Sequence, residues 1–429
     1  MEQPAATLPP QRDPWGWTLL LTAGFALLVA IRLTVPSQLF FDETHYVPAA
    51  RILIDLRGPT NVEHPMLGKQ LIALGMIWLG DNPLGWRIMS AAFGIIAFLA
   101  AARAMWWASL SRFATIAFGV LLATNFMLLI HARIAMLDIF MVAFLALAVW
   151  QGAAALRRPA QARWRLALCG IALGCAMGSK WTALALCALP GVAFALTRLE
   201  AAGPRVLTAR EGWPVPGMSL IEAFVWLGLL PLAIYFATFW PYLVYWHDPL
   251  EMTGLVPLQW QMLDLQQQVI EPHPYQSNWG QWVLNWRAIW YLYEIADGAQ
   301  RGVLLIGNPV SSLVGLAGFA WCAWQGAVRR NMPALGLAAL YGVGVGFWIV
   351  AAKPIQFFYH YLVPHCLLMG CLALMLDAGW RRRGRWRWAV WPVLGASVAV
   401  FAWYWPILSA AALEDEQSFL LFAPFPAWR

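Results

Sequence analysis

Long apolar segments alternate with short polar segments along almost the whole chain. A transmembrane α-helix needs about 20 mainly apolar residues, and about 11 segments come near this length. The pattern predicts an all-α polytopic membrane protein in which residues 1–429 form a single domain. The expected spans lie at about 15–35, 87–107, 113–130, 135–156, 166–177, 181–196, 220–240, 303–324, 334–351, 357–376 and 388–406.

Two long polar segments interrupt this pattern, at residues 36–86 and 241–301. The first contains a turn signal at residues 58–61 and a short apolar run at 71–79. That run is too short for a span, so we expect an amphipathic helix in the membrane interface. The second segment is too long for a simple connector, so we expect it to cover the active site at the outer face.

Composition supports the membrane assignment and excludes several classes of protein. Hydrophobic residues make up 61% of the chain and charged residues 11%, whereas soluble proteins average about 25% charged. The six cysteines lie in apolar runs without a CxxC pair, which is typical of buried thiols rather than disulfides or metal ligands. The net charge of +7 forms no continuous basic face, so we expect no nucleic-acid partner.

The basic residues also predict an orientation. With the N-terminus in the cytoplasm, nearly every short arginine cluster falls on the cytoplasmic side, as the positive-inside rule requires. The opposite side receives most of the acids and all seven histidines, which are His45, His64, His131, His247, His273, His360 and His365. We therefore expect an active site at the outer face of the membrane.

The most informative polar residues are Asp42 and Glu43, which directly follow the first apolar run. The chain has only 21 acidic residues, so an adjacent pair needs a reason. One interpretation is a helix N-terminus, where acids interact favourably with the macrodipole. The other is a partly desolvated general base at the membrane surface.

Four further charged residues stand near the ends of apolar runs. Lys69 follows the rigid His64-Pro65 turn and Lys180 separates two spans, so each could contact a phosphate or anchor the membrane interface. Arg133 suits phosphate oxygens. Asp138 lies just inside a span, which favours a buried polar network with a partner on another element.

Aromatic residues cluster in two further stretches. The first contains His273, Tyr275 and Trp279, and the second contains Tyr359, His360 and Tyr361. Such residues either lie at the bilayer interface or bind sugars by stacking and hydrogen bonding, and composition does not separate these alternatives. No Walker loop, HExxH or GxSxG motif occurs, and few ionisable residues lie deep in the spans. A transporter is therefore the least favoured function.

The ordered set of these motifs resembles the bacterial protein O-mannosyltransferases, which are lipid-carrier-dependent glycosyltransferases with the GT-C fold. One departure is Met66, where that family usually has a second proline. The motifs are Phe41-Asp42-Glu43, His64-Pro65 with Gly68-Lys69, Gly85-Trp86-Arg87, Arg133 to Asp138, Ser179-Lys180-Trp181, His273-Pro274-Tyr275 with Ser277 and Trp279, Gly307-Asn308-Pro309, and Tyr359-His360-Tyr361.

The resemblance implies a reaction and a set of roles. A hydroxyl acceptor would attack a polyprenyl-phosphate sugar, expected to be mannose, with inversion at the outer face of a bacterial inner membrane. Asp42 would be the base, and Glu43 would hold the acceptor or orient the base. The expected donor-phosphate residues are Arg133, Lys180, Lys69 and His360. The expected substrate-binding residues are His64, Asp138, His273, Tyr275, Trp279, Tyr359 and Tyr361.

The resemblance also bears on cofactors and partners. It requires no cofactor, although the histidine- and acid-rich outer face leaves room for a divalent cation. The expected partners are the lipid-linked donor, membrane lipids and a protein or glycan with a free hydroxyl. The alternative function is a related transferase that glycosylates lipid A or another envelope glycan.

Overall fold

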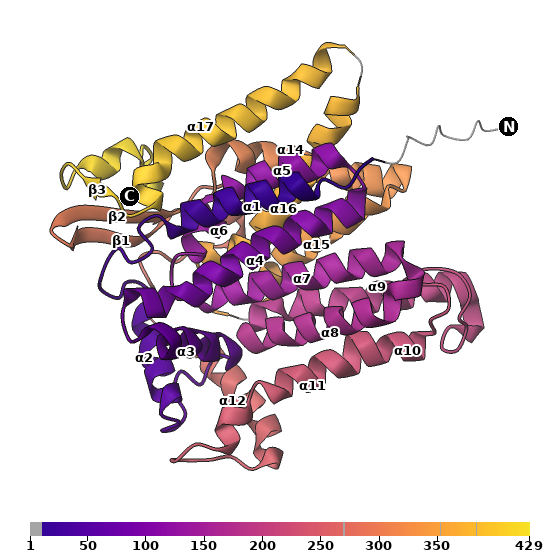
Figure 1. Ribbon diagram of the computed structural model, residues 1–429, viewed down its shortest axis with the longest axis horizontal. Coiled ribbons are helices and arrows are strands. Elements are labelled where there is room, and N and C mark those ends of the chain that lie inside the picture. Colours follow the sequence, from indigo (N-terminus) through magenta and orange to yellow (C-terminus); the bar gives the residue numbers. More distant parts are fainter. Residues whose placement is uncertain (1–10, 269–270, 352, 383) are drawn as a thin grey trace.

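The protein is a bundle of long helices, seen side-on in Figure 1. The computed structural model describes residues 11–268, 271–351, 353–382 and 384–429. The bundle helices are α1 (Trp15–Ala30), α4 (Pro83–Ser109), α5 (Arg112–Ala123), α6 (Phe126–His131), α7 (Leu137–Arg157), α8 (Ala162–Ser179), α9 (Leu184–Ala202), α10 (Leu220–Phe224), α11 (Leu230–Ala237), α14 (Pro309–Arg329), α15 (Met332–Val350), α16 (Leu362–Arg381) and α17 (Val390–Leu408).

One end of the bundle, here called the site end, carries the remaining elements (Figure 1). The α2 and α3 helices precede the long α4 helix, and α12, α13 and the strands follow α11 in the chain. The elements are α2 (Glu43–Ile54), α3 (Leu67–Leu79), α12 (Leu255–Gln267), α13 (Trp279–Val283), β1 (Ile289–Ala296), β2 (Ala299–Leu305) and β3 (Ala412–Leu413).

Local sequence explains where several helices begin. The Asn82 side chain accepts hydrogen bonds from the Leu84 and Gly85 amides, and Pro83 starts α4. Asn308 and Pro309 start α14 in the same way. Asparagine accepts from free amides at a helix N-terminus, and proline in the first turn loses no hydrogen bond.

Seven helical segments in the described part of the chain are long and apolar enough to cross a membrane. They include the segments containing α4, α7 and α16, whereas α1 and α5 are apolar but shorter. A polytopic helical membrane protein is therefore confirmed, and the total of about 11 spans stays a prediction.

Close helix packing at the centre depends on small residues. Helices α4, α7 and α8 pack side by side, and α8 packs against α11. A Cβ atom at Gly170 of α8 would lie 2.1 Å from the Trp226 carbonyl oxygen, and one at Gly174 would lie 2.5 Å from the Pro231 oxygen. Any larger residue would force these helices apart.

A three-stranded antiparallel sheet at the site end was not predicted. Strand β2 pairs with β1 through Leu292–Val303 and with β3 through Arg301–Ala412. The β1–β2 turn contains Asp297 and Gly298, both with positive φ, which is a strong hairpin signal. The predicted start of a span at residue 303 is wrong, because residues 303–305 belong to β2 and α14 begins at Pro309.

Candidate active site

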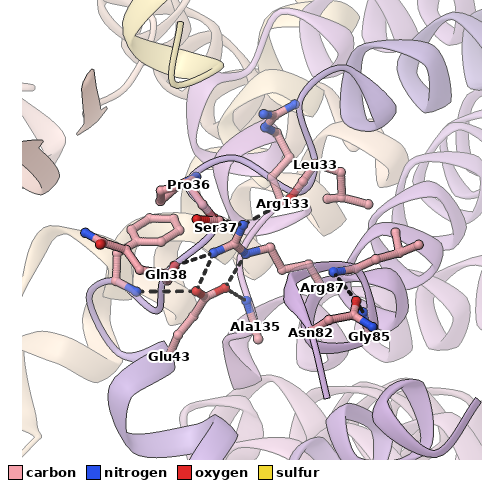
Figure 2. Close-up of polar contacts among 12 residues, drawn as sticks. Leu33, Pro36, Ser37, Gln38, Glu43, Asn82, Gly85, Arg87, Arg133 and Ala135 are labelled. Atoms are coloured by element: carbon pink, nitrogen blue, oxygen red, sulfur yellow. Dashed lines mark hydrogen bonds and ion pairs between the residues drawn. The ribbon is translucent and has the colours of Figure 1, made fainter. Parts of the chain in front are cut away.

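Glu43, the second acid of the pair, is fully buried in an ion pair with Arg87 (Figure 2). One carboxylate oxygen accepts from Arg87 Nε at 2.8 Å and from the Ala135 amide at 2.9 Å. The other accepts from Arg87 Nη2 at 2.8 Å and from the Phe40 amide at 3.4 Å. Both oxygens are occupied, so the geometry fits a supporting role for Glu43 and not a contact with the acceptor.

Arg87 extends this network along the segment that leads to the acid pair. Its Nη1 donates to the carbonyl oxygens of Leu33 (3.2 Å) and Pro36 (2.7 Å), and its Nη2 donates to Gln38 (3.0 Å). Figure 2 shows the guanidinium between this segment and Glu43. A buried charge is tolerated only when it is paired and hydrogen-bonded, and here both conditions are met.

The Arg133 guanidinium donates to backbone carbonyl oxygens and is not left free for an anion. Its guanidinium donates to carbonyl oxygens of Leu28 and Val29, to those of Ile31 and Arg32, and to that of Ser409. The last carbonyls of a helix have no partner within the helix, and Arg133 satisfies those at the end of α1. These contacts favour a structural role for Arg133, and its phosphate-binding role stays a prediction.

Asp42 has a different environment from Glu43. It precedes the first residue of α2, yet its side chain caps no amide of that helix. Within the described residues, no hydrogen bond or ion pair reaches its carboxylate. Burial raises the pKa of Asp42 to about 6, and Asp138 adds to this rise. Lys180, His45 and Lys353 oppose it.

The residue before Asp42 has an unusual backbone conformation. Phe41 has φ = 50°, in the left-handed region that bulky residues rarely adopt. This conformation costs about 1–2 kcal/mol for a residue with a side chain, so the surrounding contacts must maintain it. The turn directs the chain from the Arg87 network into α2.

Lys180 and Asp138 form a buried ion pair, and the charges of both act on Asp42. Lys180 Nζ donates to Asp138 Oδ2 at 2.7 Å, and it lies 5.0 Å from the centre of the Tyr359 ring. Asp138 is in the first turn of α7, and Lys180 directly follows α8. The partner of Asp138 is therefore on another element, as expected for an acid at the end of a span.

Lys69 organises the preceding loop. Its Nζ donates to the carbonyl oxygens of Thr60 (3.3 Å), Asn61 (2.7 Å) and His64 (3.0 Å). An ammonium group has three donors, so none remains for a phosphate. Burial lowers the pKa of Lys69 to about 7. These contacts favour a role for Lys69 in holding the loop that carries His64, and its phosphate contact stays a prediction.

Two buried imidazole nitrogens have no partner among the described residues, namely His64 Nδ1 and His360 Nε2. His360 Nδ1 accepts from the Phe357 amide at 3.0 Å, which assigns the proton of a neutral ring to Nε2. Trp348 stacks on His360 with ring centres 4.0 Å apart. Burial and the charge of Lys180 lower the pKa of His64 well below its usual value. Unpartnered buried polar atoms in the described site are suited to hydrogen bonds with a ligand.

Lys353 has no role that its local sequence predicts, and the tertiary structure brings it to the site. It lies half-buried in the segment between α15 and α16. Burial and Lys180 lower its pKa to about 8, while Asp138 and Asp42 oppose this shift. Within the described residues it forms no ion pair. Its position before Pro354 and the aromatic run was the available signal.

The other predicted substrate residues lie in different parts of the structure. Tyr359 faces the site, with its ring centre 6.1 Å from that of Phe41. Tyr361 points into the bundle, where its hydroxyl lies 2.8 Å from that of Tyr341. His273 Nδ1 accepts from the Tyr275 amide, and the His273 ring lies 5.1 Å from Phe357. Trp279 begins α13 and is 40% exposed.

Metal ligands do not cluster in the described residues. No group of three or more His, Cys, Asp or Glu side chains in residues 11–268, 271–351, 353–382 and 384–429 is placed to hold a metal ion. The site brings together the unpaired carboxylate of Asp42, Lys180, Lys353 and the imidazoles of His64 and His360, and a divalent cation stays a prediction.

Family models and a full-length relative all point to one protein family. The family model described as "Dolichyl-phosphate-mannose-protein mannosyltransferase" matches residues 79–245. The model described as "C-terminal four TMM region of protein-O-mannosyltransferase" matches residues 251–421. The polyprenol-phosphate-mannose–protein mannosyltransferase of Mycolicibacterium smegmatis is 26% identical over 488 aligned residues, covering 97% of this chain and 93% of that protein.

Solved structures show the same architecture. The Saccharomyces cerevisiae protein O-mannosyltransferase Pmt1–Pmt2 complex bound to the sugar donor aligns with a TM-score of 0.77 and 14% identity, covering 92% of this chain and 90% of the matched chain. ArnT from Cupriavidus metallidurans bound to undecaprenyl phosphate aligns with a TM-score of 0.57 and 13% identity, covering 95% and 78%. The predicted GT-C fold is confirmed.

The Glu43–Arg87 pair generates a prediction about stability. Glu43→Gln leaves Arg87 charged and buried without its counter-ion, which should cost about 3–5 kcal/mol of unfolding free energy. The matched control is Asp55→Asn, since Asp55 pairs with Arg57 in an exposed position and such pairs contribute less than about 1 kcal/mol. Thermal unfolding in detergent, followed by tryptophan fluorescence, measures both changes. Equal shifts in the two variants would contradict the assigned importance of the buried pair.

Proposed function

This chain belongs to the dolichyl-phosphate-mannose-protein mannosyltransferase family, and we propose that it transfers mannose from a polyprenyl-phosphate carrier to Ser or Thr hydroxyls of proteins. The observation that carries this proposal is the Asp42 carboxylate, which has no hydrogen-bond or ion-pair partner among the described residues and lies within range of the charges of Lys180 and Lys353. It supplies a base for the acceptor and positive charge for a phosphate in one place.

Asp42 acts as the general base in this proposal. The acceptor hydroxyl oxygen attacks the anomeric carbon of the donor and forms the new glycosidic bond, while Asp42 takes the hydroxyl proton. The bond between the anomeric carbon and the phosphate oxygen breaks, and its electron pair leaves with the polyprenyl phosphate. Attack from the side opposite the phosphate inverts the anomeric centre.

The cations stabilise the leaving phosphate. Lys180 and Lys353 offset the negative charge that develops as the glycosidic bond breaks, which is the electrostatic effect that contributes most in such sites. The unpartnered nitrogens of His64 and His360 provide hydrogen bonds to the sugar or phosphate. Tyr359 lines the same space. We assign Arg133 and Lys69 to the support of these groups and not to phosphate contact.

The acceptor is proposed to be a protein because of the family and the relatives named above. Transfer to an envelope glycan is the alternative, and it becomes an outcome of the acceptor test. Purified enzyme is incubated with polyprenyl-phosphate-mannose and a Ser/Thr peptide, and mass spectrometry detects the added hexose. Transfer only to a lipid or glycan acceptor would select the alternative.

We further propose that the chain lies in a bacterial inner membrane with its N-terminus in the cytoplasm and the site end outside. Helices α7, α14 and α16 run away from the site end, and Arg157, Arg329 and Arg381 lie in their last turns. Arginines gathered at the far end favour that end for the cytoplasm. An impermeant maleimide should label Glu271→Cys in intact cells but not Arg205→Cys, since both positions are exposed at opposite ends. The reverse pattern would overturn the orientation.

The first functional prediction concerns Asp42. Asp42→Asn removes the proton acceptor, so transfer should fall by at least about 10²-fold, the lower range for loss of general base catalysis. The thermal unfolding midpoint should change little, since no hydrogen bond or ion pair among the described residues depends on this carboxylate. Near-normal transfer by a folded Asp42→Asn protein would show that Asp42 is not the base.

The proposed base and cation also set the pH dependence. A base works only when deprotonated, so kcat/KM should rise with pH through about 6, the pKa of Asp42. A lysine stabilises phosphate only when protonated, so kcat/KM should fall through about pH 8, the pKa of Lys353. Initial rates at constant ionic strength test both limbs, and a flat profile between pH 5 and 9 is the contradicting result.

Lys353 can be tested by charge. Lys353→Gln removes a cation that acts mainly as the phosphate leaves, so kcat/KM should fall by about 10²-fold. Lys353→Arg keeps the charge and should retain most of the activity, with the alkaline limb moved to higher pH. If the Gln and Arg variants lose activity equally, the charge of Lys353 is not what the reaction uses.

A further inference from the structure

The β1–β2 hairpin contacts the residue next to the proposed base. Tyr291 on β1 stacks on Phe41, with ring centres 3.8 Å apart and an interplanar angle of 15°. The two residues are 250 positions apart in sequence. Tyr291 is 4% exposed, and its ring covers one face of the residue that precedes the half-buried Asp42.

A buried hydrogen-bond chain holds the Tyr291 ring in place. His131 Nδ1 lies 2.7 Å from the Met127 carbonyl oxygen, which can only accept, so this nitrogen carries the proton. His131 Nε2 is therefore an acceptor, and the Tyr291 hydroxyl donates to it at 3.2 Å. His131 is fully buried. The ring orientation of Tyr291 is thus set from the end of α6.

The hairpin also contacts the chain just before Phe41, at residues 37–38. The Ser37 amide donates to Asp297 Oδ2 at 2.9 Å, and the Ser37 hydroxyl donates to the same carboxylate. Gln38 Nε2 donates to Glu294 Oε1 at 2.5 Å. The hairpin therefore contacts the segment at residues 37–38 and again at Phe41.

We propose that Tyr291 is a positioning residue for the transfer reaction, because its stack on Phe41 maintains the left-handed turn that directs Asp42 into the site and keeps water away from it. This inference rests on the proposed role of Asp42. It assigns the hairpin to the catalytic apparatus rather than to the outer surface alone.

The inference predicts an effect on the ionisation of Asp42. The titratable and charged groups that face Asp42 are His45 on α2, Asp138 on α7, Lys180 after α8 and Lys353 before α16, together with the phenols of Tyr46, Tyr291 and Tyr359. Removing the Tyr291 ring leaves all the charged groups in place. It admits water to Asp42, and desolvation is the largest cause of the raised pKa of Asp42. The acid limb of the pH profile must therefore move to lower pH.

The experiment compares Tyr291→Leu and Tyr291→Phe with Tyr293→Phe. Tyr293 is on the same strand, and its hydroxyl donates to the Glu416 carbonyl oxygen away from Asp42. Tyr291→Leu should lower kcat on the order of 10- to 100-fold, with donor KM within about twofold and the acid limb at lower pH. Tyr291→Phe keeps the stack and should lose no more than a few-fold. Tyr293→Phe should behave like the native enzyme.

A second variant separates loss of the stack from misfolding of the Tyr291→Leu protein. Phe41→Ala removes the same stack from the other side, and alanine keeps the strain that the positive φ of residue 41 imposes on a residue with a side chain. It should show the same fall in kcat and the same shift of the acid limb as Tyr291→Leu.

The outcomes separate the two proposals. If both stack-removing variants keep the native kcat and acid limb, or lose activity with the limb unmoved, Tyr291 is only structural and the inference fails. That failure leaves the proposed function intact provided Asp42→Asn is inactive. If Asp42→Asn is active, the proposed role of the base fails whatever the Tyr291 variants show.

Discussion

The buried ion pair between Glu43 and Arg87 is the interaction on which the site depends. Two charges removed from water are stable only if they are paired and their remaining hydrogen-bonding atoms are satisfied. Here the need to satisfy them brings together the first residues of α2, the start of α4, the segment before α7 and the carbonyls of residues 33–38. The pair therefore determines the path of the chain that presents Asp42.

The two carboxylates of the acid pair have different surroundings. Glu43 is fully hydrogen-bonded and contributes to structure. Asp42, one residue earlier, has no hydrogen-bond or ion-pair partner among the described residues, and burial raises its pKa. The two carboxylates therefore differ in their contacts, and this difference is what supports the separate roles proposed for them.

The basic residues divide in the same way. Arg87, Arg133 and Lys69 donate to backbone carbonyls and hold loops, whereas Lys353 has a free ammonium group within the described part of the chain. Lys180 is neither free nor bound to backbone, because its ammonium group pairs with Asp138 and faces the Tyr359 ring. Backbone carbonyl groups near a membrane need hydrogen-bond partners within the protein, and here long cationic side chains donate to them.

The sequence by itself determined the helical membrane architecture, most helix positions, the acid pair and the family resemblance, because hydrophobic length, proline and asparagine caps and contiguous motifs are local properties. It also contains an Asp297-Gly298 hairpin signal that the predicted spans do not include. Only the tertiary structure decided which charges are free. The carbonyls held by Arg133 lie about 100 or more residues away, and Tyr291 reaches Phe41 across 250 residues. Such contacts depend on how helices pack, and no local pattern records which distant atoms a side chain will satisfy.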